Sequence, residues 1–458
     1  MTRRQTILLV AAVVTAVMSF QINASMLAPA IRDIEDDLGA GAFAAMSTYF
    51  YLAGAIGNVV LIRWSDFVGR RRMMLAVLVV LCVGTVLCII GTSLPVVLVG
   101  RFLQGISNVT FGLAFLIMRE RLSDTTFGVC SGLVTSLTGG VAGVDGLLGG
   151  YLADRFGYRS IFILVLVVGV LGILFCAKAL PRDSGQHAPG RMDWAGGALI
   201  ALGVAGINVY FAIGGHNGWM SSPALVVIVA AMAALVLLVL VERRVDHPLV
   251  DVAQLRSREA WPFIVVTILN MASFILVLSF IVPFVAEDHD SGFGLSGVMT
   301  ALLFLTPAAL IQLATAPLAG RLAVRVGFVK VLRAGQFGSL VVTALLAVFA
   351  HNLAAVVVLM GVFGFIYMGV TMTAMSVLGV IQAPEDEPGA LPGISNAAYG
   401  IGSSLGFAWA GPVVGSGTET SFSAALWICV AIGVLALALS LLLKPRVGSL
   451  TPEPASSA

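Results

Sequence analysis

Fourteen apolar runs follow one another along the chain, and each is long enough to cross a lipid bilayer as an α-helix. A spanning helix needs about 20 mostly apolar residues. The 458-residue chain is 59% hydrophobic and 10% charged, whereas soluble domains carry about 25% charged residues. The sequence therefore predicts an all-α membrane protein, with spans at residues 6–28, 43–63, 72–91, 96–118, 127–152, 159–179, 193–214, 223–241, 260–285, 295–318, 331–350, 353–380, 390–414 and 422–443.

The distribution of basic residues predicts the orientation of these spans. An even number of spans places both termini on one side of the membrane. Arg101 lies inside a span, and the predicted outer loops hold only Arg32, Arg155 and Arg159, so the other Lys and Arg residues, of 25 in all, fall on the inner side. Such a bias marks the cytoplasmic side. We therefore expect a multi-pass protein of the plasma (inner) membrane with both termini in the cytoplasm, and we interpret the basic start and following apolar run as a retained first span.

Two charged residues lie within predicted spans, where ionisable groups are costly and usually functional. Arg101 and Asp145 each sit roughly 9 Å inside the same membrane face, given a helical rise of 1.5 Å per residue. Their spans are joined by a short turn and are therefore expected to be antiparallel neighbours. This predicts an Arg101–Asp145 ion pair, involved either in proton coupling or only in holding the two helices together.

The two ends of the chain show signs of a duplication. Glycines recur at 128 and 389, 132 and 393, and 139 and 400, while the turn glycines Gly69 and Gly327 recur at a similar offset. Repeats of this kind are typical of transporters whose substrate site lies between two halves. We expect a six-helix bundle at 1–182, an inserted helical hairpin with cytoplasmic flanks at 183–258, a second six-helix bundle at 259–446, and a cytoplasmic tail at 447–458.

Several motifs resemble a known family. GRFLQGISN, from Gly100 to Asn108, resembles the R-x-x-Q-G motif in span 4 of the major facilitator superfamily, and RWSDFVGRRR resembles that superfamily's turn after span 2. MDWAGGALIALG, HNGWMSSP and VERRVDHPLVDVAQLRSREA look like the fourteen-span drug:proton antiporters within it. The resemblance implies a major facilitator fold of two six-helix bundles plus an inserted two-helix hairpin, alternating access, and proton-driven export of amphipathic compounds.

The resemblance also implies roles for particular residues. In the span 2 turn, Asp66, Gly69, Arg70 and Arg71 match the family pattern and are expected to form a conformational gate that locks the outward-facing state. The span 5 antiporter motif G-P-x-x-G-G is replaced here by a stretch that starts at Asp145. The acid common in span 1 of the family is missing, since Phe20 and Gln21 stand there. We therefore infer that Asp145 carries the proton.

A set of neutral polar residues is expected to line a central cavity. Arg101, Gln104 and Asn108 are spaced so that they share one helical face, and a polar stripe facing lipid would be unfavourable. Each member has an alternative role in hydrogen bonds between packed membrane helices. The predicted substrate-cavity residues are Gln21, Ser25, Gln104, Asn108, Asn270, Ser273, Gln312, Tyr367, Thr371, Asn396, Tyr399 and Ser403.

These observations predict a secondary active transporter that exports amphipathic small molecules of the multidrug type by proton antiport. The alternatives are an importer, either proton-linked or facilitative, or a lipid transporter of the same fold; a membrane enzyme or a transport-inactive sensor ranks lower. The chain lacks a P-loop sequence for ATP binding, and its five cysteines show no C-x-x-C spacing. We expect a monomer in the lipid bilayer whose partners are its substrate and protons, with no enzymatic activity, metal, cofactor or nucleic-acid partner.

Overall fold

The computed structural model describes residues 3–181, 192–243, 257, 260–381, 390–415 and 418–444, and within these residues the chain is helical and contains no β-strand. Short 3₁₀- and π-helical segments, labelled η, interrupt several of the helices. The elements are α1 (Arg3–Ser25), η1 (Ala28–Ala30), α2 (Ile31–Leu38), α3 (Ala42–Val68), α4 (Arg70–Ile90), α5 (Leu94–Gly105), η2 (Ile106–Asn108), α6 (Val109–Arg121), α7 (Asp124–Phe156), α8 (Arg159–Ala179), α9 (Trp194–Asn217), α10 (Ser222–Glu242), α12 (Trp261–Met271), α13 (Phe274–Leu276), η3 (Val277–Ile281), α14 (Val282–Glu287), α15 (Gly297–Thr300), η4 (Ala301–Leu305), α16 (Thr306–Val326), α17 (Phe328–Val348), α18 (Leu353–Phe363), η5 (Gly364–Thr371), α19 (Met372–Ile381), α20 (Ala390–Val414) and α21 (Glu419–Ser440).

The helices follow the predicted apolar runs. Among the described residues, 12 helices are long and apolar enough to cross a membrane. The remaining two predicted spans, 127–152 and 390–414, coincide with α7 and α20. The all-helical class is thus confirmed, while the number of fourteen spans stays a prediction.

The turn glycines of the two halves have the same backbone conformation. Gly69 ends α3 with φ 102° and ψ 136°, and Gly327 ends α16 with φ 104° and ψ 131°. Residues with a Cβ rarely adopt such positive φ values. The match at Gly69 and Gly327 supports the predicted duplication, whereas the partner glycine at 389 lies outside the described residues.

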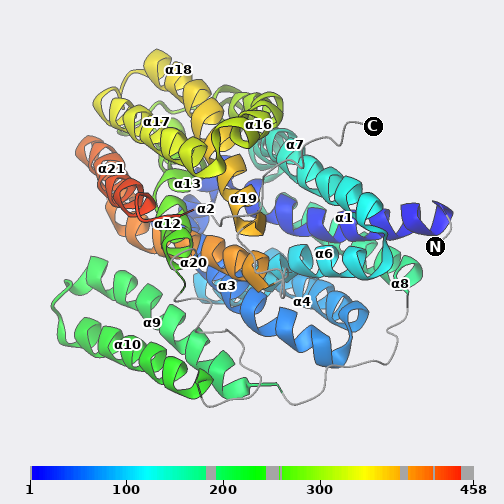
Figure 1. Cartoon of the computed structure of the whole chain (residues 1–458). Helices are drawn as coiled ribbons and strands as arrows, with labels where there is room; N and C mark the ends of the chain where they lie inside the picture. Colours follow the sequence, from blue (N-terminus) through cyan, green and yellow to red (C-terminus); the bar gives the residue numbers. More distant parts are fainter. Residues whose placement is uncertain are drawn as a thin grey trace.

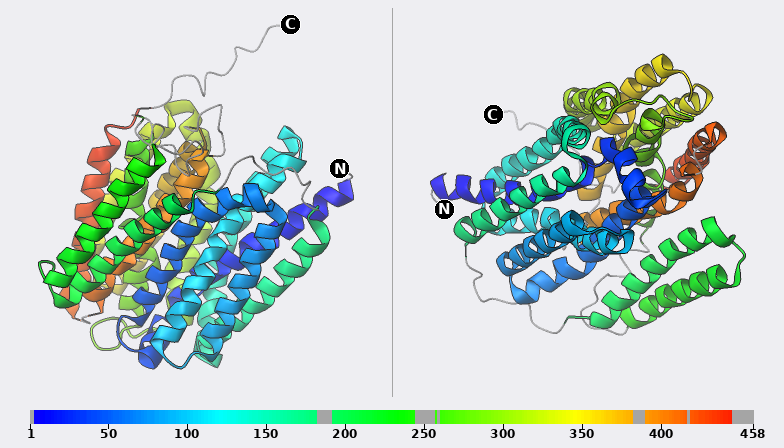
Figure 2. Two further views of the ribbon diagram at one scale, coloured as in Figure 1. Left: turned by 90° about the horizontal axis from the view of Figure 1, so that it is seen from below. Right: turned by 180° about the vertical axis from the view of Figure 1, so that it is seen from behind.

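The two halves meet along two pairs of helices. Helix α3 packs against α20, and α7 packs against α16, so each pair joins the beginning of the chain to its end. The helices form one bundle of roughly parallel rods (Figure 2). Helices α9 and α10 pack on each other, and α9 also contacts α3 and α20; the pair lies at the edge of the bundle in Figure 1.

One span of the second half is broken inside the bundle. Helix α12 ends at Met271, and Ser273 has a non-helical backbone before α13 begins. The carbonyl groups at the break are nevertheless bonded, because the Trp409 indole donates to the Ala272 carbonyl at 2.9 Å and the Cys429 thiol to the Ser273 carbonyl at 3.5 Å. Non-helical backbone at membrane depth needs such internal partners. Asn270 and Ser273, two predicted cavity residues, lie at this break.

The halves are closed against each other at the end of the bundle that holds η1, α2 and the α14–α15 loop, which we name the α2 face. Phe43 of α3 stacks on Phe280 at 5.7 Å and meets Phe407 edge-on at 6.0 Å. Gly150 of α7 is so close to Gly297 that an added Cβ would lie 2.6 Å from its backbone. The opposite end, at Gly69 and Gly327, we name the Gly69 face.

Replacing Gly150 with valine should hold the α2 face open, because no side chain fits between α7 and Gly297. The matched control is Gly132→Val on the same helix, where an added Cβ has open space. A cysteine introduced at Ala28, a residue that is 6% exposed in the closed structure, detects whether the α2 face is open. Its modification by a membrane-impermeant thiol reagent should become several-fold faster in Gly150→Val only; equal rates in both variants would contradict this packing.

Candidate functional site

Arg101 lies at the centre of a buried polar network in the first half. Its side chain is 2% exposed. One guanidinium nitrogen, Nη1, donates to Asn23 Oδ1 at 2.6 Å and to Gln104 Oε1 at 2.9 Å, and Gln104 in turn donates to Thr85 at 2.9 Å. The guanidinium also lies 4.2 Å from the Phe50 ring centroid, a cation–π geometry. The network ties together α1, α3, α4 and α5.

Asp145 lies on α7 and also binds α1. Its carboxylate accepts a 2.5 Å hydrogen bond from the Ser25 hydroxyl, and Gln21 lies 3.4 Å from that hydroxyl. Asp145 is 4% exposed, and its Oδ1 has no hydrogen-bond partner within the part of the chain that the structure describes. A side chain added at the next residue, Gly146, would meet Leu305 of the second half. Asp145 therefore lies inside the protein near the junction of the halves and does not point toward lipid.

The predicted Arg101–Asp145 ion pair is wrong: the salt bridges within the described part of the chain do not include it. Both residues bind α1, Arg101 through Asn23 and Asp145 through Ser25. Asn23 and Ser25 are two residues apart, so their side chains leave α1 in directions about 200° apart around the helix axis, on nearly opposite sides. Helix α1 therefore separates the two charges, because α7 packs on α1 instead of lying along α5.

The predicted cavity residues are buried or half-buried, and three of those in the second half hydrogen-bond to backbone carbonyls of their own segment. Asn270 donates to Val266, Ser273 to Leu269, and Thr371 to Ile366. Gln104, Asn270, Ser273, Tyr367, Thr371 and Ser403 are buried, while Gln21, Ser25, Asn108, Gln312, Asn396 and Tyr399 are half-buried. Within this set, Gln21 lies within hydrogen-bond distance of Ser25. Asn108 packs so closely on Gly54 of α3 that a Cβ added at Gly54 would touch it.

The predicted gate residues form a charge cluster at the Gly69 face. Asp66 accepts from Arg63 at 3.2 Å and from Arg70 at 3.3 Å, and Arg70 reaches Glu120 of α6 at 2.8 Å. Arg71 donates to the Ala177 carbonyl at 2.7 Å. Glu120, which follows the basic turn residue Arg119, was not among the predicted gate residues. These contacts, made among the residues that the structure describes, stay within the first half.

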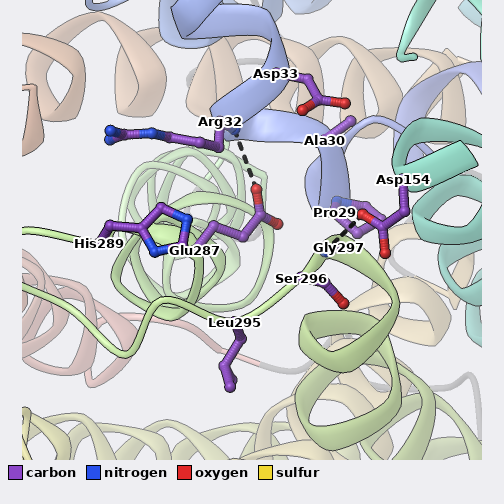
Figure 3. Close-up of a pocket in the computed structure, with 10 residues that line it drawn as sticks. All are labelled: Pro29, Ala30, Arg32, Asp33, Asp154, Glu287, His289, Leu295, Ser296 and Gly297. Carbon is purple, nitrogen blue, oxygen red and sulfur yellow. Dashed lines mark hydrogen bonds between the residues drawn. The ribbon is translucent and has the colours of Figure 1, made fainter.

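Charged residues bridge the halves at the α2 face, and the sequence analysis missed them. Arg32 pairs with Asp288 at 2.9 Å, and its backbone N–H donates to Glu287 at 3.1 Å. Asp154 accepts from the Gly297 N–H at 3.0 Å (Figure 3) and from the Val298 N–H at 3.0 Å. Glu287 and Asp288 belong to the acidic segment EDHD, and each is only 4% exposed.

Glu35 of α2 lies outside the predicted spans, and burial raises the pKa of its carboxyl from 4.5 to about 7. A pKa raised by folding means that the folded state binds this proton more tightly, so its contribution to stability is lost as pH rises from 4.5 to about 7. Glu35→Gln should therefore raise the thermal unfolding midpoint by roughly 2–4 °C at pH 8 and leave it nearly unchanged at pH 4. An equal shift at both pH values in detergent-solubilised protein would rule out this titration.

The chain belongs to the Major Facilitator Superfamily, whose sequence profile matches residues 13–407 and, in a second match, residues 263–458. It is 31% identical over 409 residues to the uridine/deoxyuridine transporter of Lactococcus lactis subsp. cremoris (strain MG1363), across 87% of this chain and 85% of that protein. It is 26% identical over 401 residues to the multidrug resistance protein Stp of Mycobacterium tuberculosis (strain CDC 1551 / Oshkosh), across 85% of this chain and 68% of that protein.

Solved structures share the fold. The partially occluded, inward-open xylose transporter XylE from E. coli superimposes with a TM-score of 0.66 at 13% identity, covering 98% of this chain and 100% of that one. At this level of identity the likeness concerns the fold alone. The relatives are transporters of small molecules, in line with a transport function for this chain.

Proposed function

We propose that the protein is a secondary transporter that takes up nucleosides, of the pyrimidine class, together with protons. The similarity to the uridine/deoxyuridine transporter carries this proposal, because it extends over 85% of that protein at 31% identity. The direction and substrate class differ from the drug export that the sequence motifs predicted; uptake was among the alternatives.

The chemistry of the buried interior supports a solute with an aromatic base and several hydrogen-bonding groups. Tyr367 packs against Phe274 at 5.6 Å and stacks on Phe363 at 5.1 Å between ring centroids. Some buried polar atoms on the helices of this half have no hydrogen-bond partner among the described residues: Tyr367 Oη, Asn270 Oδ1, Gln312 Oε1, and both amide atoms of Gln336. Apolar surfaces with a few polar groups are typical of small-molecule sites. Gln336 of α17 was not among the predicted cavity residues.

We assign proton coupling to Asp145 alone, with Ser25 as its hydrogen-bond partner. Its buried and unpartnered Oδ1 can take a proton without any rearrangement of the Ser25 bond. A titratable group at the junction of the halves is placed to sense their relative movement. Arg101 is assigned a structural role, because its Nη1 donates to both Asn23 and Gln104 and its guanidinium lies over the Phe50 ring, so that it links α1, α3 and α5.

The proposal keeps the predicted organisation of fourteen spans. Residues 1–182 and 259–446 form the two six-helix bundles, and the α9–α10 pair is an inserted hairpin in segment 183–258. The basic turns place the termini and the Gly69 face in the cytoplasm of a plasma-membrane protein, which makes the α2 face external. The closed α2 face then corresponds to an inward-facing state of a monomer, with Asp66, Gly69, Arg70 and Arg71 as the gate.

Export of amphipathic compounds is the second candidate. It is supported by the 26% identity to Stp over 85% of this chain and by the half-buried methionines Met368 and Met372, since methionine suits varied apolar ligands. The two candidates predict opposite movements of solute.

Uptake of radiolabelled uridine by cells that lack their own uridine transporters tests the proposal. Expression of the protein should raise initial uptake, an uncoupler should abolish accumulation, and unlabelled deoxyuridine should compete. The same cells should show unchanged accumulation of a fluorescent cationic dye. No uridine uptake together with reduced dye accumulation would instead support export.

A further inference from the structure

A cavity of about 110 Å³ lies between the two halves at the α2 face (Figure 3). Its walls come from η1 and α2, from the end of α7, and from the segment between α14 and α15. Asp33 and Asp154 form its solvent-exposed rim, whereas Glu287 is 4% exposed and forms its buried wall. The cavity exists only when the halves are in contact, because residues of both halves line it.

Glu287 is incompletely bonded within this cavity. Its Oε2 accepts the Arg32 backbone N–H at 3.1 Å, and the Ile31 backbone N–H also faces the carboxylate, whereas its buried Oε1 has no hydrogen-bond partner among the residues that the structure describes. The Arg32 guanidinium does not neutralise it, since that group pairs with Asp288 at 2.9 Å and with Asp36 at 3.4 Å. A buried carboxylate without a cation is strongly unfavourable.

The groups that face Glu287 add to this cost. Helix α7 contributes a carboxylate, and α2 contributes carboxylates and one guanidinium that is already paired. The loop after α14 contributes one carboxylate and one imidazole. The start of α15, with its N-cap Ser296 and first residue Gly297, contributes only neutral groups. The titratable and charged groups on these elements are Arg32, Asp33, Glu35, Asp154, Asp288 and His289. Negative charges dominate the set, and like charges favour the neutral form of a carboxyl group.

We propose that Glu287 is a proton-binding site that is occupied when the α2 face is closed and vacated when the face opens. Opening separates Glu287 from α2 and α7, hydrates its carboxylate and removes the facing charges. A proton fits better than a metal ion, because the described residues contain no group of three or more His, Cys, Asp or Glu side chains placed to hold one. The proposal depends on the closed face and not on the substrate.

Proton binding and closure are therefore linked. A group that binds its proton only in the closed state shifts the equilibrium between open and closed forms by up to tenfold for each pH unit, in favour of the closed form at low pH. Under the proposed topology this site takes its proton from the outside. It would act in addition to Asp145, which lies deeper along α7.

Distance measurements between spin labels test the site without substrate. Cysteines replace Ala40 and Asp290, exposed residues of opposite halves at the α2 face, in purified full-length protein whose five native cysteines have been replaced. In detergent micelles the short-distance population should grow as the pH is lowered from about 8.5 to about 5.5. Glu287→Gln, which mimics the protonated form, should stay mainly in the short-distance population at every pH.

Two further variants make the assignment specific. Asp37→Asn is the matched control, because Asp37 lies on α2 but binds Tyr158 at 2.7 Å and Arg159 at 2.9 Å within the first half; it should keep the pH dependence of the unmodified protein. Asp33→Asn removes one exposed charge facing Glu287 and should move the midpoint of closure to lower pH by roughly half a unit or more.

Three results would overturn the proposal. The first is a Glu287→Gln protein with the original pH dependence, and the second is a pH dependence lost in Glu35→Gln but kept in Glu287→Gln. The third is closure by added sodium chloride at constant high pH, which would assign the site to a metal cation. If Glu287→Gln does not fold, the pH midpoint of closure in Asp33→Asn tests the site instead. An unchanged midpoint in that variant contradicts proton binding at Glu287. Loss of uridine transport with normal pH-dependent closure would count against the proposed function alone.

Discussion

Asp145→Asn should abolish the accumulation of uridine against its gradient while leaving the protein folded in the membrane. Asparagine keeps the size of the side chain and can still bond to Ser25, which lies 2.5 Å from the carboxylate, but it cannot exchange a proton. Coupling energies between two ligands are typically 1–3 kcal/mol, so we expect gradient-driven uptake to fall by about 5- to 150-fold. Exchange of internal for external uridine, which needs no net proton movement, should persist.

The control for this variant is Asp37→Asn, an acid-to-amide change at a surface ion pair of α2. It should retain proton-driven uptake. Both variants are compared by initial rates in cells at external pH values from acidic to neutral. An Asp145→Asn protein that accumulates uridine as well as the original would remove Asp145 from the mechanism.

Arg101→Leu should destabilise the fold without changing the pH dependence of uptake in the protein that remains. The substitution leaves Asn23 Oδ1 buried without its Arg101 donor and leaves Gln104 Oε1 with only the weak Cys88 thiol donor at 3.7 Å, at a cost of about 1–3 kcal/mol for a buried group that loses its partner. Arg101→Lys should lose less, because an ammonium can still donate to one of them. The measurement is the thermal unfolding midpoint in detergent, followed by uptake across pH.

The opposite pattern would restore the coupling role of Arg101. An Arg101→Leu protein with an unchanged unfolding midpoint, but with the transport defect of Asp145→Asn, would mean that the two residues act together. The structure argues against it, since each residue binds a different side of α1.

Patterns local in the sequence predicted the fold well. The apolar runs became helices because hydrocarbon surroundings leave few other structures for the backbone. The turn at Gly69 and its counterpart at Gly327 were predictable, because a glycine between two spans allows the positive φ that both turns adopt. The spacing of Arg101 and Gln104 placed them on one helical face, and the two side chains hydrogen-bond at 2.9 Å; that Gln104 lines a substrate cavity stays a prediction.

Contacts between distant segments could not be predicted in the same way. The prediction of an Arg101–Asp145 pair assumed that spans joined by a short turn lie side by side, and α1, which comes much earlier in the chain, occupies that place. The Arg32–Asp288 pair joins residues 256 positions apart, and the sequence around Asp288 is equally compatible with an exposed loop. Its burial depends on closure of the two halves.

Counterflow of uridine in proteoliposomes tests the central claim, nucleoside transport by this chain, most directly. Purified protein is reconstituted into vesicles loaded with unlabelled uridine, and labelled uridine is added outside at trace concentration. The proposed function predicts a transient accumulation of label that loaded deoxyuridine also supports and that empty vesicles or vesicles loaded with xylose do not show. An identical time course in protein-containing and protein-free vesicles, with either nucleoside, would contradict it.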